Sequence, residues 1–245
     1  ISGGVIANWW PHGDTAIYET FARMSQKWIN NIPEIDWQGA NGSVQISGSR
    51  IKCWKAGGHG DQTFLEVLQN SCNPGFVKLG QLLGKERLFS YLDKFGFGEK
   101  TGVDLNGEGE GIVFPLNRVG NVELATTAFG QGISVTAIQQ VSAVSAIINN
   151  GTLYTPYIVK KIGNKEIEKT IKKENIVTSE TSELVRYALE SVVANGTGKN
   201  AYIENYRVGG KTGTAQKVID GKYAQGKYIC SFIGIAPTDD PQIVV

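Results

Sequence analysis

Hydrophobic residues recur every three to four positions in several segments of the chain, which is the pattern of helices that bury one face. Thr63 lies three residues before Glu66, and Thr136 lies three residues before Gln139. Each pair fits a capping box, in which the two side chains bind free backbone amides at a helix start. The pattern predicts helices over residues 63–70, 73–84, 86–95, 136–149 and 179–194.

After the last of these helices the pattern changes to that of strands. Residues 206–219 and 228–236 are strand-like, and Asp220-Gly221 between them is a strong signal for a hairpin turn. Residues 242–245 begin a third strand. Helices followed by antiparallel strands predict an α+β fold, with a helical subdomain packed on a mainly antiparallel sheet.

The first 44 residues do not follow this scheme. Pro33, Gly39 and Gly42 break any regular element there. We therefore expect residues 1–44 to be a separate segment and residues 45–245 to form one domain. The chain does not begin with Met, and its last four residues lie within a predicted strand. We expect a fragment that is truncated at both ends.

Composition excludes several classes of protein. A hydrophobic content of 41% with 19% charged residues is that of a globular protein. The net charge of +1 gives no reason to expect a nucleic acid partner. Three cysteines are too few for a disulfide scaffold, and two histidines without a Cys-x-x-Cys pair predict no metal site. The sequence also predicts no cofactor.

The most informative strand contains Gly210-Lys211-Thr212-Gly213-Thr214. Its Gly-Lys-Thr resembles the end of a phosphate-binding loop, but that motif needs a leading glycine where this chain has Asn205, and a helix directly afterwards. A strand and a turn follow instead. The glycines remove side chains that would prevent another molecule from lying against the strand.

A second motif, Ser71-x-Asn73, lies at the break between two predicted helices. Ser-x-Asn alone is common, and Asn73 fits the cap of the second helix. Together with Lys211-Thr-Gly-Thr it forms two of the three motifs of penicillin-recognising acyltransferases. The segments at residues 129–136, 149–151 and 196–201 are also similar to that family. The chain resembles the transpeptidase domain of class B penicillin-binding proteins of the cell-division and sporulation type.

The resemblance implies a penicillin-binding-protein/serine β-lactamase-like fold and a peptidoglycan D,D-transpeptidase. Such an enzyme transfers an acyl group from a D-Ala-D-Ala stem peptide through a serine acyl-enzyme. It implies stem peptides and β-lactams as ligands, divisome or sporulation cell-wall proteins as partners, and no cofactor. It also implies an extracytoplasmic domain, anchored in the membrane through an N-terminal segment absent from this chain.

The resemblance also assigns roles to the motif residues. Ser71 would relay a proton to the leaving amine, and Asn73 would hold the substrate amide and orient a catalytic lysine. Lys211 would supply positive potential beside Ser71. Thr212 and Thr214 would bind the terminal carboxylate, and the Thr214 N–H would form half of an oxyanion hole. Gly213 would let the substrate lie along the strand.

The resemblance places the third motif, a Ser-x-x-Lys nucleophile at a helix start, within the poorly matched residues 1–44, but the motif is missing there. Its only match is Ser49-Arg50-Ile51-Lys52, which enters an extended segment where Ser49 and Lys52 would point to opposite faces. Three explanations remain open: a motif upstream of a rearranged start, an artefactual segment 1–44, or a non-catalytic homologue. We predict that this polypeptide forms no stable acyl-enzyme. The alternatives are a pseudo-transpeptidase scaffold and a serine β-lactamase or β-lactam sensor.

Cys53 and Cys72 have two interpretations. They are two small buried residues, or they are a redox pair whose disulfide would distort the loop that holds Ser71 and Asn73. His59 lies among glycines and is interpreted as a loop residue. Cys230, on a predicted strand, is expected in the core.

Overall fold

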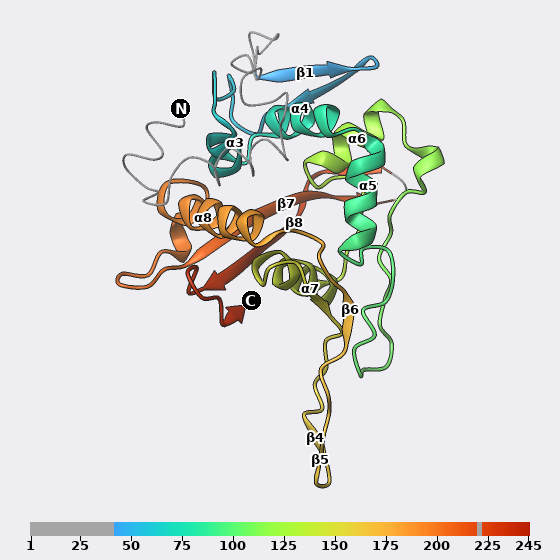
Figure 1. Cartoon of the computed structure of the whole chain (residues 1–245). Helices are drawn as coiled ribbons and strands as arrows, with labels where there is room; N and C mark the ends of the chain where they lie inside the picture. Colours follow the sequence, from blue (N-terminus) through green and yellow to red (C-terminus); the bar gives the residue numbers. More distant parts are fainter. Residues whose placement is uncertain (1–41, 220–221) are drawn as a thin grey trace. The chain divides into compact units, whose positions relative to one another are not determined.

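The computed structural model describes residues 42–219 and 222–245 (Figure 1). The prediction of a separate segment over residues 1–44 lies almost wholly outside the described residues, as does the Asp220-Gly221 turn. The described helices are α3 (Phe64–Asn70), α4 (Asn73–Leu83), α5 (Lys85–Lys94), α6 (Asn121–Ala128), α7 (Ala137–Ile148) and α8 (Ser179–Asn195), with 3-10 turns at Leu116–Arg118 and Lys199–Ala201. The strands are β1 (Ser43–Ile46), β2 (Ser49–Lys52), β3 (Leu153–Tyr154), β4 (Lys161–Ile162), β5 (Lys165–Glu166), β6 (Ile171–Lys173), β7 (Gly209–Ile219), β8 (Lys222–Ala236) and β9 (Ile243–Val244).

The main sheet is antiparallel and has the order β7-β8-β9. Helix α8 lies against β7 (Figure 1). Their approach is close: a methyl group added at Gly209 would lie 3.0 Å from the backbone nitrogen of Glu190. Ile235 on β8 and Val192 on α8 are almost fully buried. Helices and an antiparallel sheet in this arrangement confirm the predicted α+β fold.

Both predicted capping boxes are present. The backbone N–H of Thr63 donates to Glu66 Oε2 at 2.6 Å, and that of Thr136 donates to Gln139 Oε1 at 2.8 Å. The Gln139 amide nitrogen also donates to the carbonyl oxygens of Glu99 and Glu110, at 2.7 and 2.8 Å. One buried side chain therefore both caps α7 and fastens the glycine-rich segment 96–120 to it.

Two expectations were wrong in detail, and one helix was not predicted. Asn73 is not a helix cap: Cys72 holds the N-cap position of α4, and the Asn73 side chain donates to the carbonyl of Lys52 at 3.2 Å. Helix α6 was not predicted, because its eight residues include few large apolar side chains. Cys230, expected in the core, is exposed on β8.

The remaining strands form small antiparallel pairs. β1 pairs with β2, β3 with β6, and β4 with β5. Ile46 of β1 packs with Val77 of α4 and Ala125 of α6, so this hairpin belongs to the helical part of the core. The β4–β5 hairpin projects away from the sheet (Figure 1). Among the described residues, no helix combines the length and apolar character that a membrane span requires.

Candidate active site

Ser71 occupies the break between α3 and α4 in a strained backbone conformation. Its φ and ψ are 49° and 47°, in the left-handed region that a residue with a Cβ adopts at a cost. The N–H groups of Ser71 and Cys72 close the end of α3 by donating to Leu68 and Val67, at 3.2 and 3.1 Å. The Ser71 hydroxyl therefore lies at the junction of the two helices.

Lys211 reaches this junction from β7. Its Nζ donates to Ser71 Oγ at 2.7 Å and to the carbonyl oxygen of Thr212 at 2.9 Å. The structure thus brings together the two sequence motifs, from a helix break and from the sheet.

Burial controls the charge of Lys211. It lowers the pKa of this ammonium from 10.5 to about 8. Both acceptors of its hydrogen bonds are neutral oxygens. Lys211 is therefore mostly protonated at neutral pH, but its proton is held much less firmly than that of a solvated lysine.

Thr212 is held by Thr197, a residue outside both motifs. The hydroxyls of Thr197 and Thr212 lie 3.0 Å apart, and the Thr197 N–H donates to the carbonyl of Gln69 at 2.9 Å. Gln69 in turn donates to Ser191 Oγ at 2.7 Å. These contacts join the end of α3, the end of α8 and β7. Gly196, next to Thr197, is the residue in the sequence that could have indicated this close contact. A methyl group at Gly196 would lie 2.5 Å from the Gln69 carbonyl oxygen.

The rest of the strand motif faces outward or packs tightly. Thr214 is exposed and lies opposite Cys230 of β8. Gly213 lies opposite Ser231, whose Oγ would be 2.7 Å from an added methyl group. A larger residue at this position would therefore require the Ser231 side chain to move.

Ser49 is exposed on β2, opposite Ile46 in the β1–β2 hairpin. Its extended backbone sends the side chains of Ser49 and Lys52 to opposite faces, so this Ser-x-x-Lys lacks the helical geometry of a nucleophile and its lysine. Asn73, expected beside a catalytic lysine, instead contacts the Lys52 backbone. Ser71 and Lys211 are the pair that the structure brings into direct contact.

Next to Ser71, three side chains form a compact group. The sulfurs of Cys53 and Cys72 lie 3.9 Å apart, and His59 Nδ1 lies 3.2 Å from Cys53 Sγ. Burial raises the pKa of Cys72, which is 1% exposed. Burial and, second, Lys55 lower the pKa of His59. His59, interpreted from sequence as a loop residue, therefore belongs to the same cluster as the two cysteines.

A partly exposed clamp of an ion pair and a hydrogen bond fixes the ends of the strand pair. Arg207, just before β7, donates through Nε and Nη2 to the Glu190 carboxylate at 3.1 and 2.7 Å. Thr238, just after β8, donates to Glu190 Oε2 at 2.5 Å. Burial alone would raise the pKa of Glu190, but the hydrogen bonds of Arg207 and Thr238 lower it below its ordinary value. The clamp thereby ties α8 to both long strands.

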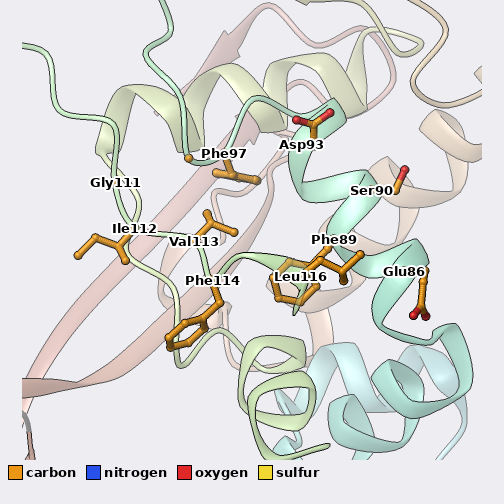
Figure 2. A pocket seen from close by; sticks show the side chains of 11 residues that line it. Glu86, Phe89, Ser90, Asp93, Phe97, Gly111, Ile112, Val113, Phe114 and Leu116 are labelled. Carbon is orange, nitrogen blue, oxygen red and sulfur yellow. The ribbon is translucent and has the colours of Figure 1, made fainter. Parts of the chain in front are cut away.

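A separate hollow of about 640 Å³ lies between α5 and the segment before α6 (Figure 2). Phe89 of α5 lines it together with Val113, Phe114 and Leu116. None of the residues that line it belongs to the Ser71 or Lys211 motifs. The motif residues therefore form a distinct site.

Similarity to known proteins extends over the domain that carries these motifs. The family model described as "Penicillin binding protein transpeptidase domain" matches residues 33–245. Stage V sporulation protein D of Bacillus subtilis is 64% identical over 210 residues, which cover 83% of this chain and 32% of that protein. Penicillin-binding protein PbpB of Mycobacterium tuberculosis is 34% identical over 220 residues, with the same coverage. The chain therefore spans about a third of the length of these curated relatives.

Solved structures agree. The crystal structure of penicillin binding protein 3 from Mycobacterium tuberculosis complexed with ampicillin matches with a TM-score of 0.74 and 33% identity, covering 84% of this chain and 48% of that one. The apo transpeptidase domain of Burkholderia pseudomallei penicillin-binding protein 3 also gives a TM-score of 0.74, at 33% identity, covering 84% of this chain and 60% of that one.

The start of the chain gives a different result. A second family model, that of DNA gyrase and topoisomerase IV, matches residues 1–50. The segment in which the sequence analysis expects the nucleophile motif is thus similar to another protein family. The transpeptidase match, by contrast, covers most of the chain and includes both motifs that meet at Ser71 and Lys211. The chain belongs to the penicillin-binding-protein transpeptidase family, in its class B branch.

Proposed function

We propose that residues 45–245 are the part of a peptidoglycan D,D-transpeptidase domain that binds the stem-peptide carboxylate and moves the proton to the leaving group. The observation that carries this proposal is the 2.7 Å hydrogen bond from Lys211 Nζ to Ser71 Oγ. An ammonium that donates to a hydroxyl leaves the hydroxyl proton free to be donated elsewhere. Ser71 is then a proton donor held in a fixed position.

The reaction would proceed by acyl transfer. A serine attacks the D-Ala-D-Ala carbonyl, the C–N bond breaks, and D-Ala leaves after its amine takes a proton. Ser71 relays that proton: it gives its own to the leaving amine and takes up the one that the attacking serine loses, while Lys211 stabilises the negative charge that develops on Ser71 Oγ during the transfer. An amine of a second stem peptide then attacks the acyl-enzyme and forms the cross-link. Asn73 would hold the substrate amide after its side chain leaves the Lys52 carbonyl.

Strand β7 would provide the binding wall. The hydroxyls of Thr212 and Thr214, together with Lys211, would bind the terminal carboxylate. The exposed position of Thr214 supports this role. Its backbone N–H would form half of the oxyanion hole, a contribution of about 3–4 kcal/mol in comparable sites. Gly213 would admit the substrate backbone beside the strand.

In this chain the acyl-enzyme would not form. The only Ser-x-x-Lys, at Ser49, lies on an exposed strand. We infer that residues 1 to about 32 come from a protein unrelated to the transpeptidase, since residues 1–50 match the gyrase and topoisomerase model and the transpeptidase model begins at residue 33. This favours a foreign or artefactual segment among the three explanations for the missing motif. Sequencing genomic DNA across codons 30–60 tests the inference; an uninterrupted reading frame joining both parts in the source genome would contradict it.

The proposed location is extracytoplasmic, where peptidoglycan is cross-linked. The proposed ligands are stem peptides and β-lactams, the latter supported by the ampicillin complex of the mycobacterial relative. Sporulation or divisome cell-wall proteins are the proposed partners, supported by 64% identity to a stage V sporulation protein.

Labelling with a fluorescent penicillin tests the function directly. The chain itself should give no covalent adduct. A hybrid in which the corresponding upstream segment of Bacillus subtilis stage V sporulation protein D replaces residues 1–44 should be labelled. Lys211→Ala in the hybrid should slow labelling at least 100-fold, because it removes the charge beside Ser71. Equal labelling of both hybrids would contradict the assignment, and labelling of the original chain that Ser49→Ala abolishes would restore Ser49 as nucleophile.

Two alternatives remain distinguishable by the same assay. A pseudo-transpeptidase scaffold is favoured by the missing nucleophile, and its hybrid would bind penicillin without acylation. If the domain is a serine β-lactamase or a β-lactam sensor, the fluorescent penicillin would also label the hybrid. A β-lactamase, however, would release the hydrolysed label within minutes. A persistent adduct therefore supports the transpeptidase over the hydrolase.

A further inference from the structure

Cys53, His59 and Cys72 come from three separate segments but converge on one point. Cys53 follows β2, His59 lies in the glycine-rich turn before α3, and Cys72 lies between α3 and α4. Their ligand atoms all lie within 4.8 Å of one another. The proposed transpeptidase mechanism uses none of these three side chains.

Two of the three atom pairs are spaced like ligands around one metal ion. Zinc binds sulfur at about 2.3 Å and nitrogen at about 2.0–2.1 Å in a tetrahedral arrangement. Such an ion requires about 3.8 Å between two sulfurs and about 3.6 Å between sulfur and nitrogen. The Cys53–Cys72 sulfurs are 3.9 Å apart, and Cys53 Sγ is 3.2 Å from His59 Nδ1. Both distances are within a few tenths of an ångström of these values.

The chemistry of the three donors selects the class of metal. Two thiolates and an imidazole suit zinc and other borderline or soft ions, whereas magnesium and calcium require oxygen ligands. We propose that Cys53, His59 and Cys72 bind one zinc ion, with His59 coordinating through Nδ1 and a water completing the tetrahedron. Binding releases one proton from each thiol to solvent, so the ion and its two thiolates are together neutral.

A buried side chain beside the cluster supports this assignment. Gln62 is 7% exposed, and its Oε1 accepts a hydrogen bond from Asn70 at 2.8 Å. Its Nε2 makes no hydrogen bond of standard geometry with the described residues, although the Gln62 side chain lies close enough to the Cys72 thiol to act on its pKa. A buried N–H without an acceptor is unfavourable. A metal-bound thiolate is a stronger acceptor than a thiol and would satisfy this donor, as second-layer groups do in metal sites.

The surrounding structure holds the three ligands in place. The Cys53 N–H donates to the Gly42 carbonyl at 2.7 Å, and a methyl group at Gly58 would lie 2.6 Å from the Gly42 Cα. The Trp54 ring contacts the His59 ring edge-on at a centroid distance of 5.3 Å, and its Nε1 donates to the Asn70 carbonyl at 2.9 Å. The turn with His59 is thereby packed against the end of α3.

The location of the ion would matter for the neighbouring motif. Cys72 lies between Ser71 and Asn73, so a bond from its sulfur to zinc would fasten the strained junction to β2 and to the glycine-rich turn. The sequence predicted no metal site because spacing along the chain does not reveal three ligands from three segments. The metal site itself does not depend on the proposed transpeptidase function.

Metal titration of the whole chain tests the site. The protein is reduced, stripped with a chelator under anaerobic conditions, and titrated with zinc or cobalt(II). We expect one ion per chain, and cobalt should give the near-ultraviolet bands of thiolate coordination. Cys53→Ser, His59→Ala and Cys72→Ser should each weaken binding at least 10-fold, because loss of a ligand costs no less than loss of an outer-layer partner. Cys230→Ser, which removes an exposed cysteine, is the matched control and should bind normally.

A measurement on the unaltered protein guards against variants that fail to fold. Zinc should protect Cys53 and Cys72 from alkylation while Cys230 continues to react. Peptide mapping by mass spectrometry identifies each thiol. Equal alkylation of Cys53 and Cys72 with and without zinc would overturn the proposal. So would cobalt binding without thiolate bands, or binding that the three ligand variants leave unchanged.

Discussion

Lys211 Nζ donates a 2.7 Å hydrogen bond to the hydroxyl of Ser71, a residue in left-handed backbone conformation at the end of a helix. The two groups come from opposite parts of the fold, a helix break and a sheet. In this contact the backbone of Ser71 is strained, and the ammonium of Lys211 is desolvated. Each of these features has a measurable consequence for stability.

The backbone of Ser71 predicts an order of stability for two substitutions. Ser71→Gly and Ser71→Ala both remove the hydroxyl, but only glycine adopts φ of 49° without a Cβ clash. We expect Ser71→Gly to be more stable than Ser71→Ala by about 1 kcal/mol in urea unfolding. Equal stability of the two variants would show that the left-handed conformation is not kept in solution.

The buried charge of Lys211 predicts a dependence on pH. Its pKa is about 8 in the folded protein and 10.5 in the unfolded chain, so the unfolded chain binds more protons between these values. Stability relative to Lys211→Met should therefore increase as pH rises from 8 towards 10.5, on the order of 2 kcal/mol by pH 10. Unfolding free energies of both proteins across this range measure it. Lys217→Met, at an exposed position of β7, controls for the loss of one positive charge, and a constant difference for Lys211→Met would refute the expectation.

The Glu190 clamp predicts a pH dependence of the same sign, but at acid pH. Its folded pKa lies below the ordinary 4.5, so the stabilisation is present above that value and is lost as pH falls through the folded pKa. Glu190→Gln should lower stability by about 1 kcal/mol at neutral pH, and the difference should vanish in acid. Glu183→Gln, exposed on the same helix, is the control. A difference that persists unchanged at low pH would mean that packing, not charge, explains the loss.

The proximity of Cys53 and Cys72 predicts a redox response in metal-free protein. Oxidised glutathione should take two electrons and two protons from the thiols, forming one disulfide and two molecules of reduced glutathione. Mass mapping without reductant should then find a Cys53–Cys72 peptide pair and a free Cys230. Two free thiols at Cys53 and Cys72 after oxidation would exclude the redox pair. Prior addition of zinc should suppress the disulfide, because the same sulfurs would be occupied.

Local patterns predicted much of the fold. The capping boxes at Thr63 and Thr136 fixed two helix starts, and alternating residues with glycines identified β7. Two short motifs identified the family. These features depend on residues that are close together in the sequence, so the sequence alone is enough to predict them.

Other features depend on contacts that the chain order hides. Asn73 contacts the Lys52 backbone because β2 packs beside α4, and no property of Asn73 itself indicates this. Helix α6 is stabilised by packing, with Ala128 directly against Gly80, more than by its own apolar pattern. Likewise, the proximity of His59 to Cys53 is evident only from the three-dimensional structure.

Gln139 fastens both ends of a glycine-rich segment, at Glu99 and Glu110. Inside it, Glu108 accepts backbone hydrogen bonds from Thr101 and Gly102, at 2.7 and 3.1 Å. The residues between Glu99 and Glu110 thus form a loop whose two ends are held together. The length of this loop therefore does not determine the position of α7. A short peptide tag or a fluorophore attachment site inserted between residues 104 and 107 should therefore leave the Ser71–Lys211 contact intact, which makes this loop a practical site for attaching optical reporters.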